Sequence, residues 1–254
     1  MHAVVTGASS GIGEAIARRL AKAGWTLTLA ARREEALIAL AEELDVECFI
    51  RRTDLSDTSE CEKLIVEATD ALGPIDVLVN NAGIQFVEPA EAVTPDRIDL
   101  LMTVDLLSPL HLSHYVLQEM LARQSGVIVN VASMAGIIAT PGMSHYNGAK
   151  HGLAAVSESM RVELRRSGVH VLTVYPGPVY TPMEAAGREA YTESWVTKFV
   201  PTGTPDVLAS LIFDGIRKKR ARIVYPRTYG FARYFRISAQ WFTDVFTPAL
   251  EKGN

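Results

Sequence analysis

A tyrosine and a lysine stand four residues apart, as Tyr146 and Lys150. On a helix this spacing places both side chains on the same face. A phenol has a pKa of about 10, so it exchanges protons poorly near neutral pH. A nearby ammonium group favours the phenolate and lowers that pKa. The pair therefore predicts Tyr146 as an acid–base residue, with Lys150 supplying the charge and holding a cofactor ribose.

Ser133 precedes Tyr146 by thirteen residues and directly follows the apolar run Val127–Ala132. If that run is a strand, the Ser133 hydroxyl lies at its carboxyl end, where open α/β sheets bind ligands. A hydroxyl there can hydrogen-bond the oxyanion that develops on a carbonyl. Tyr146 would donate the proton in reduction and accept it in oxidation. The three residues predict interconversion of a carbonyl and an alcohol by hydride transfer.

A glycine-rich turn, Thr6–Gly13, follows the first apolar run of the chain. Glycines let the backbone approach a pyrophosphate closely, and the N-terminus of a helix starting near Ile12 would face the anion. The residues expected to contact the pyrophosphate are Gly7, Ser9, Ser10, Gly11, Ile12 and Gly13. A turn without a ligand is the alternative interpretation. Its place between a strand and a helix favours a dinucleotide site.

The end of the second apolar run bears on the choice of cofactor. An acidic residue there would hold the ribose 2′-hydroxyl of NAD. This chain has Arg32 and Arg33 instead, and a guanidinium can pair with a 2′-phosphate. We therefore expect NADP with Arg32 as the main contact and Arg33 in reserve, while NAD stays an alternative. Both arginines could also be surface charges at a helix start.

Short apolar runs alternate with helical patterns as far as about residue 175, which predicts parallel strands joined by helices. The expected strands are Val4–Thr6, Thr26–Ala30, Val46–Ile50, Ile75–Val79, Gly126–Ala132 and Val169–Val174. The expected helices are Gly13–Ala23, Glu34–Leu44, Thr58–Leu72, a pair over Asp96–Arg123, and His145–Arg166. This order predicts a single-domain α/β fold, a Rossmann-like doubly wound parallel sheet flanked by helices on both faces. Beyond it, Pro176, Pro178 and Pro182 predict an irregular segment up to about Pro205.

Over residues 1–226 the chain resembles the short-chain dehydrogenase/reductase family. The matching motifs are Thr6–Gly13, Asp54-Leu55, Asn80-Asn81-Ala82-Gly83, Ser133, Tyr146 with Lys150, and Tyr175-Pro176-Gly177. The resemblance implies that Asp54 and Leu55 border the adenine. It implies further cofactor contacts from Asn81, Ala82 and Gly83, and nicotinamide contacts from Pro176, Gly177, Val179 and Thr181. It also implies a homodimer or homotetramer.

One residue departs from the family pattern. Asp105 stands where the family usually has an asparagine that helps hold a water beside the lysine. A carboxylate there could pair with Lys150 and stabilise its charged form. Asp105 is thus a candidate for the proton relay, and a tolerated substitution is the alternative.

Composition limits the other classes of function. The chain has 254 residues, of which 48% are hydrophobic, and a net charge of −4. These values suit a packed globular domain and do not indicate a nucleic-acid partner. Cys48 and Cys61 suggest neither a disulfide framework nor a zinc site, so no metal is expected. We expect a cytoplasmic protein, because the glycine turn follows the first residues without room for a signal peptide and no apolar run would span a membrane.

A basic and aromatic extension occupies residues 227–254, within the same domain. Eight basic and no acidic residues lie between Arg217 and Arg236, and aromatic residues are interleaved with them. A helix over residues 228–247 could lie on an anionic membrane, which would make the protein membrane-associated. Alternatively, the aromatic side chains cap the substrate pocket or fill a subunit interface.

The leading hypothesis is an NADP-dependent oxidoreductase for an apolar carbonyl or secondary alcohol. The alternative is a dinucleotide-binding regulator of the same fold without turnover. Met183, Tyr191, Trp195 and Phe199 suggest an apolar substrate pocket, although they could equally form the core of a lid. His145 could touch the substrate, but an exposed or locally bonded histidine fits its position better.

Overall fold

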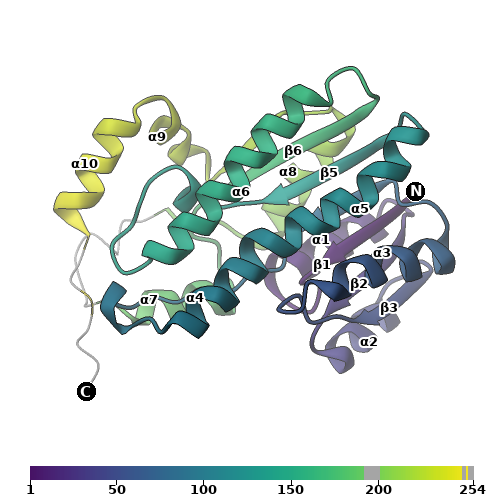
Figure 1. Cartoon of the computed structure of the whole chain (residues 1–254), viewed down its shortest axis with the longest axis horizontal. Coiled ribbons are helices and arrows are strands. Elements are labelled where there is room, and N and C mark those ends of the chain that lie inside the picture. Colours follow the sequence, from purple (N-terminus) through teal and green to yellow (C-terminus); the bar gives the residue numbers. More distant parts are fainter. Residues whose placement is uncertain (192–200, 248–249, 251–254) are drawn as a thin grey trace.

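The computed structural model describes residues 1–191, 201–247 and 250. Its centre is a sheet of seven parallel strands in the order β3-β2-β1-β4-β5-β6-β7 (Figure 1). The strands are β1 (His2–Thr6), β2 (Thr26–Ala31), β3 (Cys48–Arg52), β4 (Val77–Asn80), β5 (Gly126–Val131), β6 (Val169–Pro176) and β7 (Arg222–Tyr225). The strand order reverses between β1 and β4, which is where such folds bind their ligands. The predicted fold class is confirmed.

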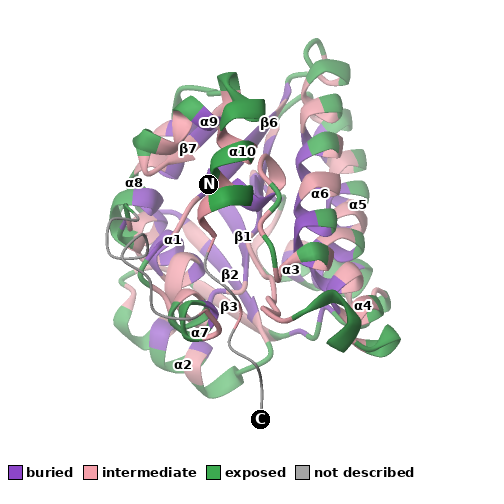
Figure 2. Ribbon diagram, turned by 90° about the vertical axis from the view of Figure 1, so that its left-hand side faces the viewer, coloured by how far each residue is buried: buried purple, intermediate pink, exposed green. Residues whose placement is uncertain are grey.

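Helices cover both faces of the sheet, and Figure 2 shows the buried strands between them. One face carries α1 (Gly11–Ala21), α2 (Glu34–Glu43) and α8 (Pro205–Arg217). The other carries α3 (Ser59–Leu72), α5 (Ser108–Ala122) and α6 (Ser144–Glu163). Successive residues of a strand point to opposite faces, so Leu78 enters one core and Val79 the other. Burial on both faces explains why these strands are apolar throughout.

Two strands begin later than the sequence predicted. β3 starts at Cys48 rather than Val46, because Cys48 is the first residue in register with β2, opposite Leu27. β4 starts at Val77, opposite Ala3 of β1. The apolar pattern thus located these strands, whereas pairing with the neighbouring strand decided where each one begins.

The predicted helix pair over Asp96–Arg123 is one helical path with an irregular middle. It consists of α4 (Pro95–Met102), the π-helical turn η2 (Thr103–Leu107) and α5, and the short turn η1 (Ala90–Ala92) precedes it. Within the described residues only this path, Pro95–Ala122, is long and apolar enough to cross a membrane. Leu112, Val116 and Met120 are fully buried and pack with α3 and the sheet. The path is therefore a core helix of this fold.

A short helix, α7 (Pro182–Glu189), interrupts the segment that was predicted to be irregular. Thr181 caps it, because its hydroxyl accepts a hydrogen bond of 3.2 Å from the Glu184 N–H. Pro182 occupies the first turn, where the missing N–H costs nothing. The expectation that Pro182 belongs to an irregular segment was therefore wrong. Thr181 followed three residues later by Glu184 was the signal for a helix start.

The C-terminal extension is a broken helix rather than a single one. It contains the turn η5 (Arg227–Tyr229), α9 (Gly230–Tyr234) and α10 (Arg236–Phe246), with Phe235 outside helical geometry between the last two. In Figure 1 these helices lie at one edge of the molecule, beside α6. Gln240 donates to the carbonyl oxygen of Ala139 and accepts from its N–H, both at 2.9 Å. These bonds attach the extension to the loop after β5 and the turn η3 (Met134–Gly136).

Candidate active site

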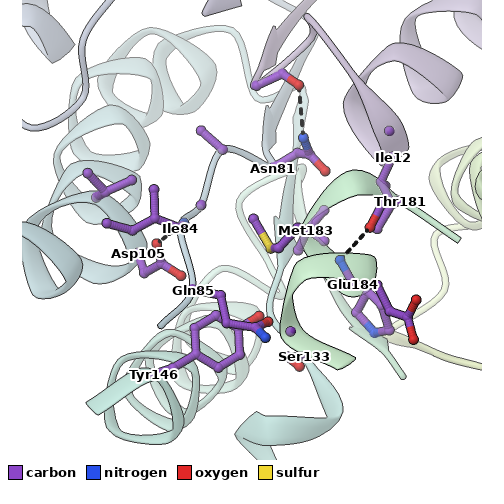
Figure 3. A pocket seen from close by; sticks show the side chains of 18 of the residues that line it. Ile12, Asn81, Ile84, Gln85, Asp105, Ser133, Tyr146, Thr181, Met183 and Glu184 are labelled. Carbon is purple, nitrogen blue, oxygen red and sulfur yellow. Dashed lines mark hydrogen bonds between the residues drawn. The ribbon is translucent and has the colours of Figure 1, made fainter. Parts of the chain in front are cut away.

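The residues predicted for the site converge on one pocket at the carboxyl ends of the central strands. The pocket has a volume of about 630 Å³, and Figure 3 shows its inner wall. Its lining includes Gly7, Ser9, Ser10, Gly11, Ile12, Arg32, Arg33, Asp54, Leu55, Asn81, Ala82, Gly83, Asp105, Ser133, Tyr146, Lys150, Pro176, Gly177, Val179 and Thr181. This volume lies in the range of pockets that bind small molecules and cofactors.

Gly13 is the one predicted contact that does not line the pocket. A Cβ atom at Gly13 would lie 2.2 Å from the carbonyl oxygen of Gly7 and 2.5 Å from Asn81 Nδ2. Its missing side chain therefore serves the close packing of α1 against the glycine turn. Gly7 and Gly11 have φ values of +67° and +60°, which glycine adopts readily. The residues present thus form a cradle, with the α1 N-terminus at one side, that fits a pyrophosphate.

Asn81 joins the loop after β4 to the glycine turn after β1. Its Nδ2 donates to the carbonyl oxygen of Thr6 at 3.0 Å, and its N–H donates to Thr6 Oγ1 at 3.0 Å. Ala82 N–H donates to the same hydroxyl, which itself donates to the Val79 carbonyl oxygen. These bonds hold the two loops that would contact the dinucleotide at a fixed separation.

Of the two arginines after β2, Arg33 reaches the glycine turn. Its Nη2 donates to both the carbonyl oxygen and the hydroxyl of Ser9, each at 3.1 Å. Arg32 lines the same region of the pocket. Asp54 is exposed there, and its carboxylate accepts hydrogen bonds from Ser56. The arginines fit a 2′-phosphate, and Arg33 has a fixed contact that the sequence did not predict.

Ser133 and Tyr146 lie beside each other in the pocket (Figure 3). Ser133 follows β5 and caps η3, where its hydroxyl accepts a hydrogen bond of 3.1 Å from the Ala135 N–H. Tyr146 lies in the first turn of α6 and is only 7% exposed. Lys150, one turn later, places its ammonium nitrogen 5.6 Å from the centre of the Tyr146 ring. The helical spacing thus brings the two side chains together as predicted.

Asp105 lies on the π-helical turn η2 and pairs with Lys150. The Lys150 Nζ and Asp105 Oδ2 atoms are 3.1 Å apart, and both side chains are almost completely buried. The other carboxylate oxygen accepts a hydrogen bond of 2.7 Å from the Ile84 N–H. Lys150 also donates to the Val131 carbonyl oxygen at 3.5 Å. Asp105 therefore connects the lysine to the loop after β4.

The direction of the Tyr146 pKa differs from the prediction. Burial raises the pKa of Tyr146, and the Asp105 carboxylate adds to this, while Lys150 and Ser133 act in the opposite direction. The pKa of Lys150 is also raised, because Asp105 and Tyr146 outweigh the effect of its burial. Lys150 thus remains charged, but its partner carboxylate offsets its effect on the phenol. The sequence predicted a lowered pKa for Tyr146 because it did not reveal the burial of the phenol, and it offered the pair between Asp105 and Lys150 only as one option.

Several lining residues were not among the predicted site residues. They include Ile84, Gln85, Thr140, Met143, Glu184, Arg188 and Thr247. Ile84 and Gln85 directly follow the motif Asn80-Asn81-Ala82-Gly83, which was the signal that could have indicated them. Met183 and Tyr191 line the pocket as suggested, whereas Trp195 and Phe199 lie outside the described residues. His145 does not line the pocket and bonds locally, with its Nδ1 atom 3.4 Å from Ser144 Oγ.

A chain of hydrogen bonds between buried polar side chains connects the elements around the site, and the sequence did not predict it. Asn80 Nδ2 donates to Asn130 Oδ1 at 2.8 Å, and Asn130 Nδ2 donates to Ser157 Oγ at 3.1 Å. Ser157 in turn shares a bond of 2.8 Å with Thr173. This chain joins β4, β5, β6 and α6. Asn81 directly follows β4, Ser133 lies just after β5, and Tyr146 lies on α6. Among the described residues, no cluster of histidine, cysteine and carboxylate side chains could hold a metal ion.

Comparisons with known proteins agree with this geometry. The family described as short chain dehydrogenase matches residues 1–192. The chain is 32% identical to the ketoacyl reductase HetN of Nostoc sp. over 87% of its own length and 77% of the relative. It is 36% identical to a D-beta-hydroxybutyrate dehydrogenase of Rhizobium meliloti, over 71% of this chain and 72% of the relative.

Solved structures show the same similarity. An actinorhodin polyketide ketoreductase variant with NADPH is 33% identical, with a TM-score of 0.83 over 88% of this chain and 95% of that one. A short chain dehydrogenase/reductase from Burkholderia phymatum with NAD covers 100% of this chain and 97% of its own, with a TM-score of 0.84. At 24% identity this second likeness shows the fold alone. The chain belongs to the short-chain dehydrogenase/reductase family and is an NAD(P)-dependent oxidoreductase of that family.

Proposed function

We propose that the protein is an NADPH-dependent reductase that converts an apolar ketone into a secondary alcohol, and catalyses the reverse oxidation. The observation that carries the proposal is that Ser133, Tyr146 and Lys150 meet in the same pocket as the glycine cradle. Relatives named as a ketoacyl reductase and a hydroxybutyrate dehydrogenase support a ketone carried on an acyl chain as the reacting group.

The proposed mechanism assigns a separate task to each side chain. A bound nicotinamide dinucleotide supplies or accepts the hydride. In reduction, Tyr146 donates its hydroxyl proton to the carbonyl oxygen, and the Ser133 hydroxyl donates a hydrogen bond to the same oxygen. Lys150 stabilises the resulting phenolate through its charge. Asp105 positions the Lys150 ammonium group and keeps it protonated through the 3.1 Å ion pair.

The pocket wall supports an apolar substrate. Ile84, Met143 and Met183 line it, and Ile84 and Met143 pack against the cluster that contains Tyr146. Methionine side chains adapt to substrates of different shape. Arg188 also lines the pocket, but it pairs with Glu184. A charged substrate would have to compete with that pair.

The choice of NADPH rests on the two arginines after β2. Arg33 is held at the glycine turn by Ser9, and no carboxylate stands at the end of β2 to hold a 2′-hydroxyl. We expect Arg33→Ala to weaken NADPH binding at least tenfold, because a charge-assisted contact to phosphate is lost. NADH binding should change little. An NADPH preference that survives both Arg33→Ala and Arg32→Ala would refute the assignment.

The function is tested by following the absorbance of NADPH with a panel of 3-oxoacyl esters and apolar ketones. Tyr146→Phe should reduce turnover by about two to four orders of magnitude, because the proton donor is removed. Tyr115→Phe, on α5 and away from the pocket, is the matched control. Full activity of Tyr146→Phe would sink the mechanism. Binding of NADPH by the unmodified protein without turnover on any substrate would support the non-catalytic regulator instead. The cytoplasmic location and the homodimer or homotetramer stay predictions.

A further inference from the structure

Large apolar side chains are concentrated on the outer surface of the C-terminal extension. We call this surface the aromatic face, and it consists of Phe231, Tyr234, Phe235, Ile237, Trp241, Phe242 and Val245. These seven belong to a set of sixteen exposed large hydrophobic residues in the described chain, although they span only fifteen positions. Ile237 is 88% exposed, Tyr234 82% and Trp241 61%. A concentration of exposed apolar side chains is typical of a surface that binds a membrane or another protein.

The opposite side of these helices is fixed to the domain. Ala232 is buried, Ala239 packs beside it, and Gln240 makes its two bonds to Ala139. Ile237, Trp241 and Val245 follow one another at intervals of four residues, so they form one stripe on α10. Figure 2 shows α10 with this exposed surface. The body of the protein therefore holds the aromatic face in an outward orientation.

The aromatic face does not cap the pocket. Within the described part of the extension only Thr247 lines the pocket, and none of the aromatic face residues does so. The rings contact one another instead, with Phe231 stacked on Phe235 at 4.4 Å between ring centres. The interpretation of these aromatic residues as a pocket lid is thus not supported by their positions.

The rim of the aromatic face is positively charged. Arg227 and Arg236 are exposed and flank residues of this face in the chain, and Arg236 Nη2 lies 3.4 Å from His151 Nε2. Arg233 is 3.7 Å from Glu158 on α6. Asp244 is the single acidic residue between positions 227 and 247, and it accepts a hydrogen bond from Gln240. The chain as a whole has a net charge of −4, so this positive edge is a local feature.

We propose that the aromatic face binds the surface of an anionic lipid bilayer, with α9 and α10 lying in the plane of the membrane. Tryptophan, tyrosine and phenylalanine beside arginine suit the boundary between headgroups and acyl chains. Anionic headgroups attract the arginines of the rim. In a two-fold pair of chains that met on this face, each copy would present the same positively charged rim, because a two-fold interface uses the same surface of both subunits. The charge of the rim therefore favours lipid over self-association.

Membrane binding would also place the pocket beside the bilayer. Thr247 directly follows α10 and lines the pocket, so the pocket lies next to the membrane-bound end of that helix. An apolar substrate dissolved in the bilayer would then have a short path to Tyr146. This consequence rests on the proposed function, whereas the lipid contact itself does not.

The test uses the full chain and sedimentation with vesicles of phosphatidylcholine, with and without about one-third phosphatidylglycerol. We expect binding to the anionic vesicles and at least a tenfold loss in the triple variant Ile237→Ser/Trp241→Ser/Phe242→Ser. The matched control is Val66→Ser/Val162→Ser/Val207→Ser, which removes similarly exposed apolar side chains from α3, α6 and α8. Arg227→Gln/Arg236→Gln should weaken binding by about fivefold for each charge, on anionic vesicles only. NADPH binding should survive in all variants and reports that the fold is intact.

Three results would overturn the proposal. The first is an intact protein that does not sediment with anionic vesicles, and the second is a control triple variant that loses as much binding as the Ile237→Ser/Trp241→Ser/Phe242→Ser variant. The third is an oligomer that dissociates in the Ile237→Ser/Trp241→Ser/Phe242→Ser variant while the unmodified protein does not bind vesicles. That third result would assign the aromatic face to a second copy of the chain. None of these results depends on NADPH turnover, so failure here and failure of the proposed function are distinguishable.

Discussion

Asp105→Asn removes one charge from a buried ion pair and leaves the size of the side chain unchanged. At 3.1 Å and an effective dielectric constant of about 20, the attraction between Asp105 and Lys150 is about 5 kcal/mol before desolvation is subtracted. Removing one partner of a buried pair costs about 3 to 5 kcal/mol. The amide oxygen of asparagine can keep the hydrogen bond from the Ile84 N–H. We therefore expect the free energy of unfolding to fall by about 3 kcal/mol.

The same substitution should change the pH dependence of the reaction. The Asp105 carboxylate raises the pKa of Tyr146, so its removal lowers that pKa as long as Lys150 stays protonated. Oxidation of the alcohol needs Tyr146 as the phenolate, which forms as pH rises through this pKa. The rising limb of kcat/KM against pH in the oxidation direction should therefore move to lower pH.

The assay is alcohol oxidation between neutral and alkaline pH, together with denaturant unfolding of the same samples. Asp99→Asn, at an exposed position of α4, is the matched control and should leave both quantities unchanged. An unshifted limb would show that Asp105 does not act on Tyr146. A limb shifted to higher pH would show that Lys150 loses its proton without Asp105, and would refute the reasoning about the charged lysine.

Two further predictions concern stability. Gly13→Ala should lower the free energy of unfolding by about 1 to 3 kcal/mol and abolish NADPH binding, because its Cβ would lie 2.2 Å from the Gly7 carbonyl oxygen. Gly148→Ala is the control, because its Cβ would meet only Met102 Cε, at 3.8 Å. Equal melting temperatures of the Gly13→Ala and unmodified proteins would contradict the steric argument. Burial lowers the pKa of His2 in the folded protein below its usual value of 6.5. The neutral imidazole therefore contributes its full stability above pH 6.5, and this contribution is lost as pH falls through the lowered pKa of the folded state. Denaturant unfolding between pH 7 and about pH 5 should show a steeper loss of stability for the unmodified protein than for His2→Gln, by up to about 1.4 kcal/mol per pH unit. The pKa of His170 is lowered as well, but His170 is present in both proteins and so cancels in the comparison. Parallel stability curves would exclude His2 as the cause.

The sequence was sufficient for those features that depend on neighbouring residues. Apolar runs such as Val127–Ala132 give strands, and the interval between Tyr146 and Lys150 gives a shared helix face, because both follow from backbone geometry alone. The glycine turn Thr6–Gly13 is local in the same way. Since parallel strands carry their ligands at their carboxyl ends, these local features also predicted that Ser133 would lie beside the cofactor loops.

Only the tertiary structure decided how distant residues act on one another. The sequence offered pairing with Lys150 as one option for Asp105, and the π-helical turn η2 realises it by placing the two groups 3.1 Å apart in a buried site. Burial then raises the pKa of Tyr146. The loss of hydration disfavours the phenolate by more than Lys150 favours it, because the Asp105 carboxylate offsets the charge of the lysine. Gly13 likewise proved to be a packing residue through its contact with Gly7 and Asn81. Distances across the fold and access to water are properties of the packed chain, and no local pattern of residues contains them.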